Sequence, residues 1–222
     1  MQDTKEAKEV EFAVEILQPI VNGLPSLVER LNLEEGAMGD AGQNELVIQR
    51  EIVVLLKARL PAPSLVRKNE LLIRDQGGAC IPDIIIDNIG GGCWAAIELK
   101  VHLGGNRLPH ARIKRDFDKL ARYKAEHPDA YCVFMLVCRA TQRQDVTGLS
   151  DAIDFEAIGD EYLARHDEIM GLLEDYAPYR PRLCAIGRHR TATEAMAWEV
   201  VDSRQSNFVE QVAYRFSAKM RR

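Results

Sequence analysis

The sequence contains no hydrophobic segment long enough to cross a membrane. Its longest uninterrupted apolar run, residues 131–138, is far shorter than the roughly 20 residues of a membrane-spanning helix. Residues 1–11 mix lysine with acidic residues and lack the apolar core of an export signal. We therefore expect no contact with a membrane and a cytoplasmic location.

Closely spaced metal-binding and phosphate-binding motifs are also missing. The cysteines are odd in number and show no CxxC or Cys/His spacing, so they predict reduced, buried thiols rather than a zinc site or disulfides. The histidines form no HExxH motif, and the glycines at 90–92 and 104–105 lie outside any GxGxxG or GxxxxGK[ST] pattern. These absences argue against zinc proteases and against P-loop or dinucleotide-binding enzymes.

Positive charge is scarce in the chain as a whole but not in its middle. The net charge is -5, which argues against a general nucleic-acid coat. Residues 1–35 hold eight acidic side chains against three basic ones, whereas residues 100–143 hold ten Lys or Arg against four acidic residues. The middle of the chain is therefore the part suited to a polyanion such as DNA.

The residues that are present predict a single α/β domain of 222 residues. With 46% hydrophobic residues the chain can bury a full core. We expect an N-terminal helical cover at 1–43, a core at 44–138 and a helical and strand elaboration at 139–222. The core should be a mixed central sheet of about four to six strands flanked by helices.

Apolar spacing places the N-terminal helices. Residues 10–33 suit one or two helices that are broken near Gly23 and Pro25. A polar, glycine-rich stretch then leads into a helix over 44–60, for which Asn44 is the expected N-cap.

Strand patterns follow this helix. Residues 65–75, 81–88 and 93–101 read as three strands, and the IGGG turn between the last two predicts a hairpin. Residues 110–125 are helical in pattern, and 131–138 form a strand buried on both faces. The expected order in the core is helix, three strands, helix, strand.

The C-terminal part alternates similar patterns. Residues 149–176 are largely helical in pattern, 182–186 and 195–201 suit two more strands, and 207–220 suit a final helix.

Three charged residues stand inside very apolar strands. Asp83 lies in IPDIII, and Glu98 and Lys100 lie in AAIELK. Charged residues are costly in such strands unless they serve a site. In a hairpin the start of one strand lies beside the end of the other, so the three side chains can converge. Glu98 and Lys100 are two residues apart and project from the same face.

Two carboxylates and a lysine suit metal-dependent cleavage of a phosphodiester. Asp83 and Glu98 would hold Mg²⁺, or Mn²⁺ in its place, against a phosphate oxygen and a water molecule. Lys100 would act either as a group whose pKa is lowered by burial or as an ammonium that stabilises charge developing on the phosphate. The backbone carbonyl of Leu99 is a further candidate metal ligand.

This constellation resembles the PD-(D/E)XK, or restriction-endonuclease-like, nuclease superfamily. The superfamily pattern is met without substitution by Pro82, Asp83, Glu98 and Lys100. The order of elements over about 44–138 is also similar to that of its core. The resemblance implies a restriction-endonuclease-like fold and a metal-dependent nuclease, commonly acting on DNA, in which the Asp and Glu bind metal and the Lys serves catalysis.

The superfamily often adds a glutamate from the helix before the first strand. Glu45 and Glu51 both lie on that helix. Glu45 extends the apolar stripe that continues through Ile48, so its carboxylate would point inward and need a partner. We favour Glu45, with Glu51 as the alternative.

The helix after the hairpin carries a basic stripe. Its members, spaced three or four residues apart, are Arg112, Arg115, Lys119 and Arg122. Such a stripe suits contacts with the phosphates of a bound strand. The alternative is a solvated helix face on which Lys114 pairs with Asp118.

These patterns together predict a metal-dependent nuclease that hydrolyses phosphodiester bonds, with DNA as the expected substrate. An alternative is a catalytically silent domain of the same fold that binds nucleic acid or a protein partner. A third hypothesis, an unrelated α/β interaction protein, requires Asp83 and Glu98 to lie far apart. The intact Asp, Glu and Lys favour the enzyme, and a homodimer is compatible with it.

Overall fold

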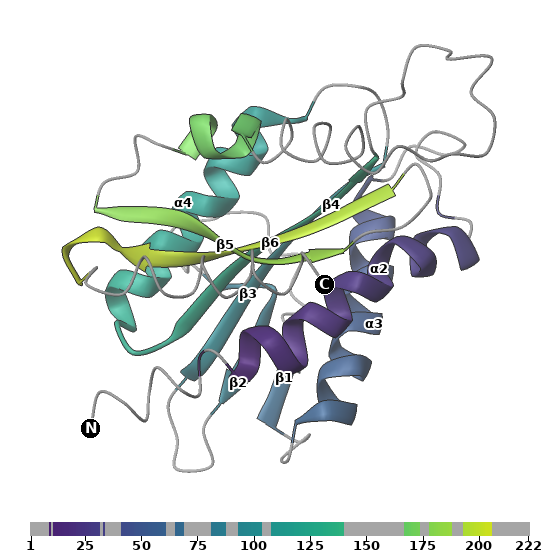
Figure 1. The fold of residues 1–222 in the computed structure, drawn as a ribbon, viewed down its shortest axis with the longest axis horizontal. Coiled ribbons are helices and arrows are strands. Elements are labelled where there is room, and N and C mark those ends of the chain that lie inside the picture. The colour runs from purple at the N-terminus through teal and green to yellow at the C-terminus, as the bar shows by residue number, and fades with distance from the viewer. Residues whose placement is uncertain are drawn as a thin grey trace, which may run out of the picture.

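The computed structural model shows a mixed six-stranded sheet with helices on both faces (Figure 1). The residues that it describes are 9, 11–31, 33, 41–60, 65–68, 81–87, 93–103, 108–139, 167–173, 178–187 and 193–205. Within them, no helix is both long enough and apolar enough to span a membrane.

The elements follow the expected order of helix, three strands, helix, strand, with two further strands behind. The helices are the π-helix η1 (Phe12–Leu17), α2 (Gln18–Arg30), α3 (Ala41–Arg59), α4 (His110–Glu126) and the 3-10 helix η3 (Ser203–Gln205). The strands are β1 (Val66–Lys68), β2 (Ile84–Asp87), β3 (Cys93–His102), β4 (Tyr131–Arg139), β5 (Tyr179–Gly187) and β6 (Thr193–Asp202). Residues 167–173 are also helical.

The strands lie in the order β1-β2-β3-β4-β6-β5. β3 and β4 are parallel and are joined through α4, whereas the other neighbouring pairs are antiparallel. A parallel pair needs a crossover of this kind, because its two strands start at the same end of the sheet. The expected hairpin is confirmed by the antiparallel pairing of β2 with β3.

The two faces of the sheet bury separate apolar clusters. In β3 the odd-numbered residues, such as Ile97 and Leu99, pack with apolar residues of α2 and α3. Ala96, by contrast, packs with Phe117 of α4 and with residues of the helix 167–173. Because side chains alternate along a strand, Glu98 and Lys100 belong to the face that α4 covers.

The expected helix break near Gly23 and Pro25 is wrong, because α2 runs through both residues. Pro25 has no N–H to donate to the carbonyl of Val21. Gly187 of β5 lies so close to this carbonyl that a Cβ on it would be 2.0 Å from the oxygen. Gln18 also bonds both backbone groups of the residue before Gly187, at 2.5 and 3.2 Å. Packing against β5 therefore supports a helix that local propensity disfavours.

Other boundaries differ by a few residues. α3 begins at Ala41, so Asn44 lies inside the helix and is not its N-cap. The described part of the first expected strand is β1, and the rest of 65–75 lies outside the described residues. The glycine turn at 89–92, most of the expected helix over 149–176 and the final helix over 207–220 also lie outside them.

The cysteines whose side chains are described lie inside the fold. Cys132, Cys138 and Cys184 are buried and form no disulfide, as the sequence predicts.

Candidate active site

The end of β3 presents an open edge that two carboxylates occupy. β2 pairs with β3 only as far as Ile97. Beyond that point Oδ2 of Asp83 accepts the N–H of Leu99 at 2.8 Å. Oε2 of Glu45 accepts the N–H of Val101 at 3.2 Å. Carboxylates from the residue before β2 and from α3 thus accept the backbone N–H groups of β3 that a neighbouring strand would otherwise bond.

Glu98 and Lys100 lie at the same end of β3, under α4. Their exposed fractions are 3% and 9%. Asp83 accepts the N–H of Leu99, the residue next to Glu98, and burial followed by the charge of Asp83 raises the pKa of Glu98. The structure therefore brings Asp83, Glu98 and Lys100 together at one end of the sheet.

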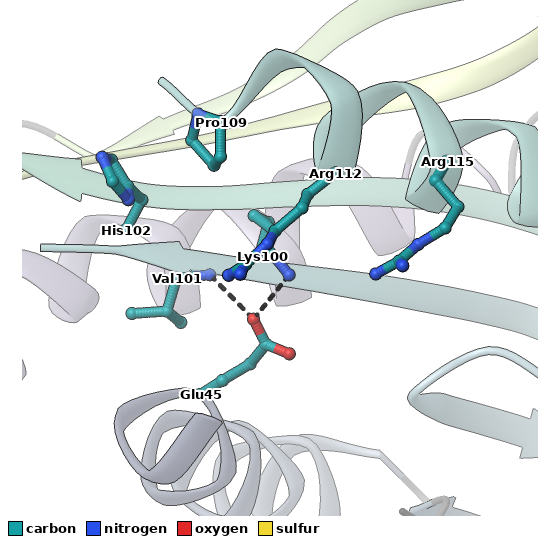
Figure 2. Close-up of a pocket in the computed structure, with 7 residues that line it drawn as sticks. All are labelled: Glu45, Lys100, Val101, His102, Pro109, Arg112 and Arg115. Atoms are coloured by element: carbon teal, nitrogen blue, oxygen red, sulfur yellow. Dashed lines mark hydrogen bonds and ion pairs between the residues drawn. The ribbon is translucent and has the colours of Figure 1, made fainter. Parts of the chain in front are cut away.

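Lys100 is held between two carboxylates from different helices. Its Nζ is 3.0 Å from Oε2 of Glu45 and 3.0 Å from Oδ2 of Asp116 (Figure 2 shows the contact with Glu45). Burial acts to lower the pKa of Lys100, but the two carboxylates outweigh it and raise the pKa above its ordinary value. Of the two roles expected of Lys100, the raised pKa contradicts the one that needs a lowered pKa and is compatible with the ammonium role.

A second lysine, Lys119 of α4, pairs with the buried glutamate. Its Nζ contacts Oε1 of Glu98, while Oε2 of Glu98 is buried and has no hydrogen-bond partner among the described residues. Burial, then the nearby charge of Asp83, raise the pKa of Glu98 well above its usual range, although Lys119 opposes them. A buried carboxylate oxygen without a donor is a costly arrangement that a cation would relieve.

Asp83 shows the same balance of forces. Burial raises its pKa to about 6, against the opposing effects of Lys119 and of the Leu99 N–H. Each of the two carboxylates thus resists ionisation, and bringing a positive charge between them would favour both charged forms.

The charges and donor atoms of the site fit a hard divalent cation. The surrounding carboxylates are Glu45, Asp83, Glu98 and Asp116, and the ammonium groups are Lys100 and Lys119. When all are ionised, the formal charge is about that of one divalent cation with opposite sign. In strand geometry the carbonyl of Leu99 points to the same edge as its amide, so it can join Asp83 and Glu98 as a ligand.

Side-chain ligands alone would not complete such a coordination shell. In the described parts of the chain, no three His, Cys, Asp or Glu side chains form a cluster that could hold a metal. Mg²⁺ commonly takes one or two carboxylates and completes its shell with water and phosphate oxygens. The donor set therefore suits Mg²⁺ or Mn²⁺ at a phosphate-binding site better than a structural zinc ion.

The helix carboxylate that reaches the site is Glu45. Gln49, one turn further along α3, is buried and donates to the backbone oxygen of Asp83 at 2.8 Å. These two residues share the helix face toward β3, whereas Glu51 is offset from it. Gln49 was missed in the sequence, although its position four residues after Glu45 places it on the same face.

Asp116 was also missed, and α4 carries a signal that could have revealed it. It lies three residues after Ile113 and four before Leu120, and both of these are fully buried. An aspartate in that stripe must face inward and needs a cationic partner. Lys100 is that partner.

The basic stripe of α4 divides into three parts. Arg112 and Arg115 line a cleft next to Lys100. Lys119 lies within the site, on Glu98. Arg122 does not line the cleft and instead pairs with Asp118 at 2.6 Å on the exposed surface.

The raised pKa of Asp83 predicts a pH-dependent effect of its removal. The pKa of the Asp83 carboxyl rises on folding, so its protonated form stabilises the folded protein. This contribution is fully present below about pH 4 and is lost as the pH rises through about 6. Without metal, the free energy of unfolding of Asp83→Asn should therefore rise relative to that of the wild type by roughly 2 to 3 kcal/mol as the pH is raised from 4 to 7. Urea unfolding of both proteins in EDTA measures this, and a difference that stays constant with pH would contradict it.

Comparison of the chain with protein-family models, with curated proteins and with solved structures finds no match.

Proposed function

We propose that this protein is a metal-dependent nuclease with a restriction-endonuclease-like core that hydrolyses phosphodiester bonds in DNA. The main support is the buried Oε2 of Glu98, which has no hydrogen-bond partner among the described residues and lies near Asp83 at the open edge of β3. When bound there, Mg²⁺ or Mn²⁺ would polarise a phosphate oxygen and lower the pKa of a water molecule.

Lys100 has the electrostatic role in this proposal rather than that of a base. Its raised pKa keeps it protonated at neutral pH. We call the carboxylates of Asp83 and Glu98 the metal pair. A fixed ammonium beside them would stabilise the negative charge that develops on the phosphate as the bond breaks. Glu45 of α3 and Asp116 of α4 act as positioning residues, because a carboxylate oxygen of each lies 3.0 Å from Nζ of Lys100.

Lys119 partly offsets the effect of burial on Asp83 and Glu98. Burial raises the pKa of both carboxyls, and the ammonium of Lys119 opposes this rise without cancelling it. Both carboxylates are therefore more readily available as ligands near neutral pH than burial alone would allow.

Digestion of linear, circular and single-stranded DNA, with RNA in parallel, tests the proposal. We expect cleavage with Mg²⁺ or Mn²⁺ and none in EDTA, because the carboxylate pair needs a cation to act on phosphate. Cleavage of the circular substrate would identify an endonuclease. Binding of DNA without cleavage in either metal would refute the enzyme and leave the silent binding domain.

A further inference from the structure

A cleft adjoins the metal pair where β3 ends and α4 begins (Figure 2). Its volume is about 170 Å³. The charged residues that line it are Glu45, Lys100, Arg112 and Arg115. Neither Asp83 nor Glu98 lines it, so the cleft is a space beside the metal pair and not the metal position itself.

Positive charge exceeds negative charge in this cleft. Figure 2 shows the nitrogen ends of Lys100, Arg112 and Arg115 turned toward the space above Glu45. One oxygen of Glu45 already accepts from both Lys100 and the backbone of Val101. Arg112 forms no ion pair with any residue that the structure describes, and Arg115 is 3.7 Å from Asp116. Two arginines thus point into a cleft that offers them little negative charge.

The start of α4 adds to this field. Pro109, the N-cap residue, lines the cleft and offers no side-chain hydrogen bond to the helix, and the first turn contains no acidic residue. The N-terminal end of a helix carries partial positive charge on its amides. The helix start and the arginines therefore both favour an anion, and Glu168, which contacts His110 at the first residue of α4, offsets part of the contribution of the helix.

Size and position indicate a single phosphate group. Small-molecule sites usually have volumes of roughly 300 to 1,000 Å³, whereas this cleft has about 170 Å³, enough for a phosphate and part of a sugar. Side chains on one face of a strand repeat about every 7 Å. Lys100 is one such step from Glu98 and His102 is two, and this step is close to the spacing of neighbouring phosphates in a nucleic-acid strand.

We propose that the cleft binds one phosphate of the substrate strand, next to the phosphate at Asp83 and Glu98, with Arg112 and Arg115 as its main ligands. Guanidinium groups match phosphate oxygens in pairs of hydrogen bonds. The inference rests on the proposed function only in taking the bound strand as the one that is cleaved. The phosphate is either an internal phosphodiester or a terminal phosphomonoester, which share this chemistry.

Binding of a short oligonucleotide in EDTA, followed by fluorescence anisotropy, tests the site without cleavage. We compare the wild type with the double variant Arg112→Gln, Arg115→Gln. Both arginines are exposed, so the fold should be unaffected. Arg180→Gln is the matched control, because it removes an exposed arginine from β5, three strands from β3.

The double variant should bind about tenfold more weakly, and the control should bind like the wild type. Because both arginines act on one phosphate, the slope of log affinity against log salt should fall by about 0.7 for a single strand. A fall of about twice that size would mean two separate phosphates and would overturn the single-phosphate site. Unchanged affinity in the double variant would overturn the site altogether.

Oligonucleotides with a 5′-phosphate, a 3′-phosphate or neither distinguish a terminal phosphomonoester from an internal phosphodiester in the cleft. A preference for one phosphorylated end that disappears in the double variant supports a terminal phosphate. Equal binding of all three that weakens in the double variant supports an internal one.

Cleavage assays in Mg²⁺ separate this inference from the proposed function. If the wild type cleaves DNA and the double variant binds it with the same affinity as the wild type, the proposed phosphate site is wrong and the proposed nuclease stands. If nothing is cleaved but binding depends on Arg112 and Arg115, the nuclease is wrong and the phosphate site stands.

Discussion

Glu98→Gln should reduce DNA cleavage by about a thousandfold or more while leaving the metal-free protein at least as stable as the wild type. A metal supplies several kcal/mol to a phosphoryl transition state, and about 4 kcal/mol corresponds to a factor of a thousand. The glutamine amide would place a donor where Oε2 stands, so the site would lose a ligand. Stability should hold, because burial already favours the neutral form of Glu98.

Calorimetric titration with Ca²⁺, which resembles Mg²⁺ in its oxygen ligands, would measure the lost metal affinity directly. Glu51→Gln is the matched control, because it makes the same change on α3 outside the contacts of the site. Equal cleavage by the Glu98 variant and the wild type would rule out the carboxylate pair as the metal site. A large loss of stability without metal would instead assign Glu98 a structural role.

Lys100→Met should also abolish cleavage, but with a different effect on stability. Lys100 balances Glu45 and Asp116 in a site where its side chain is 11% exposed. Removing one partner of a buried ion pair leaves charge without compensation and costs about 3 to 5 kcal/mol. Adding Asp116→Asn should return part of this stability without restoring cleavage, because the ammonium remains absent.

Urea unfolding of the two single variants and the double variant gives the coupling between Lys100 and Asp116. We expect it to be at least about 1 kcal/mol, since the two groups are 3.0 Å apart and buried. The DNA affinity of Lys100→Met in EDTA should fall less than that of the Arg112 and Arg115 double variant, because Lys100 is already paired with carboxylates of the protein. Cleavage at the wild-type rate by Lys100→Met would make the motif match coincidental.

The placement of Asp83, Glu98 and Lys100 was predictable from local patterns. Strand periodicity puts Glu98 and Lys100 on one face, and the antiparallel pairing of β2 with β3 brings Asp83 alongside them. The apolar stripe of α3 likewise indicated Glu45 ahead of Glu51. These inferences needed only neighbouring residues and the known geometry of a helix or a hairpin.

The partners of these residues depended on contacts between distant segments. Asp116 and Lys119 enter the site only because α4 crosses the face of the sheet between β3 and β4. From the sequence alone, Lys119 could be assigned only to a basic surface stripe, because no neighbouring residue reveals that Glu98 lies opposite it. The continuity of α2 through Pro25 has the same origin, because β5 is more than 150 residues away in the chain.

The amino-acid sequence by itself therefore determined which residues have the chemistry for holding a cation and on which strand faces they lie, because side-chain periodicity is a local property of the backbone. Only the tertiary structure decided their protonation and their surroundings. Burial and the charges that distant elements bring close set each pKa, which is why the pKa of Lys100 lies above its ordinary value and that of Asp83 is raised to about 6. The same crossover of α4 places Arg112 and Arg115 over the end of β3 and so forms the cleft next to Lys100.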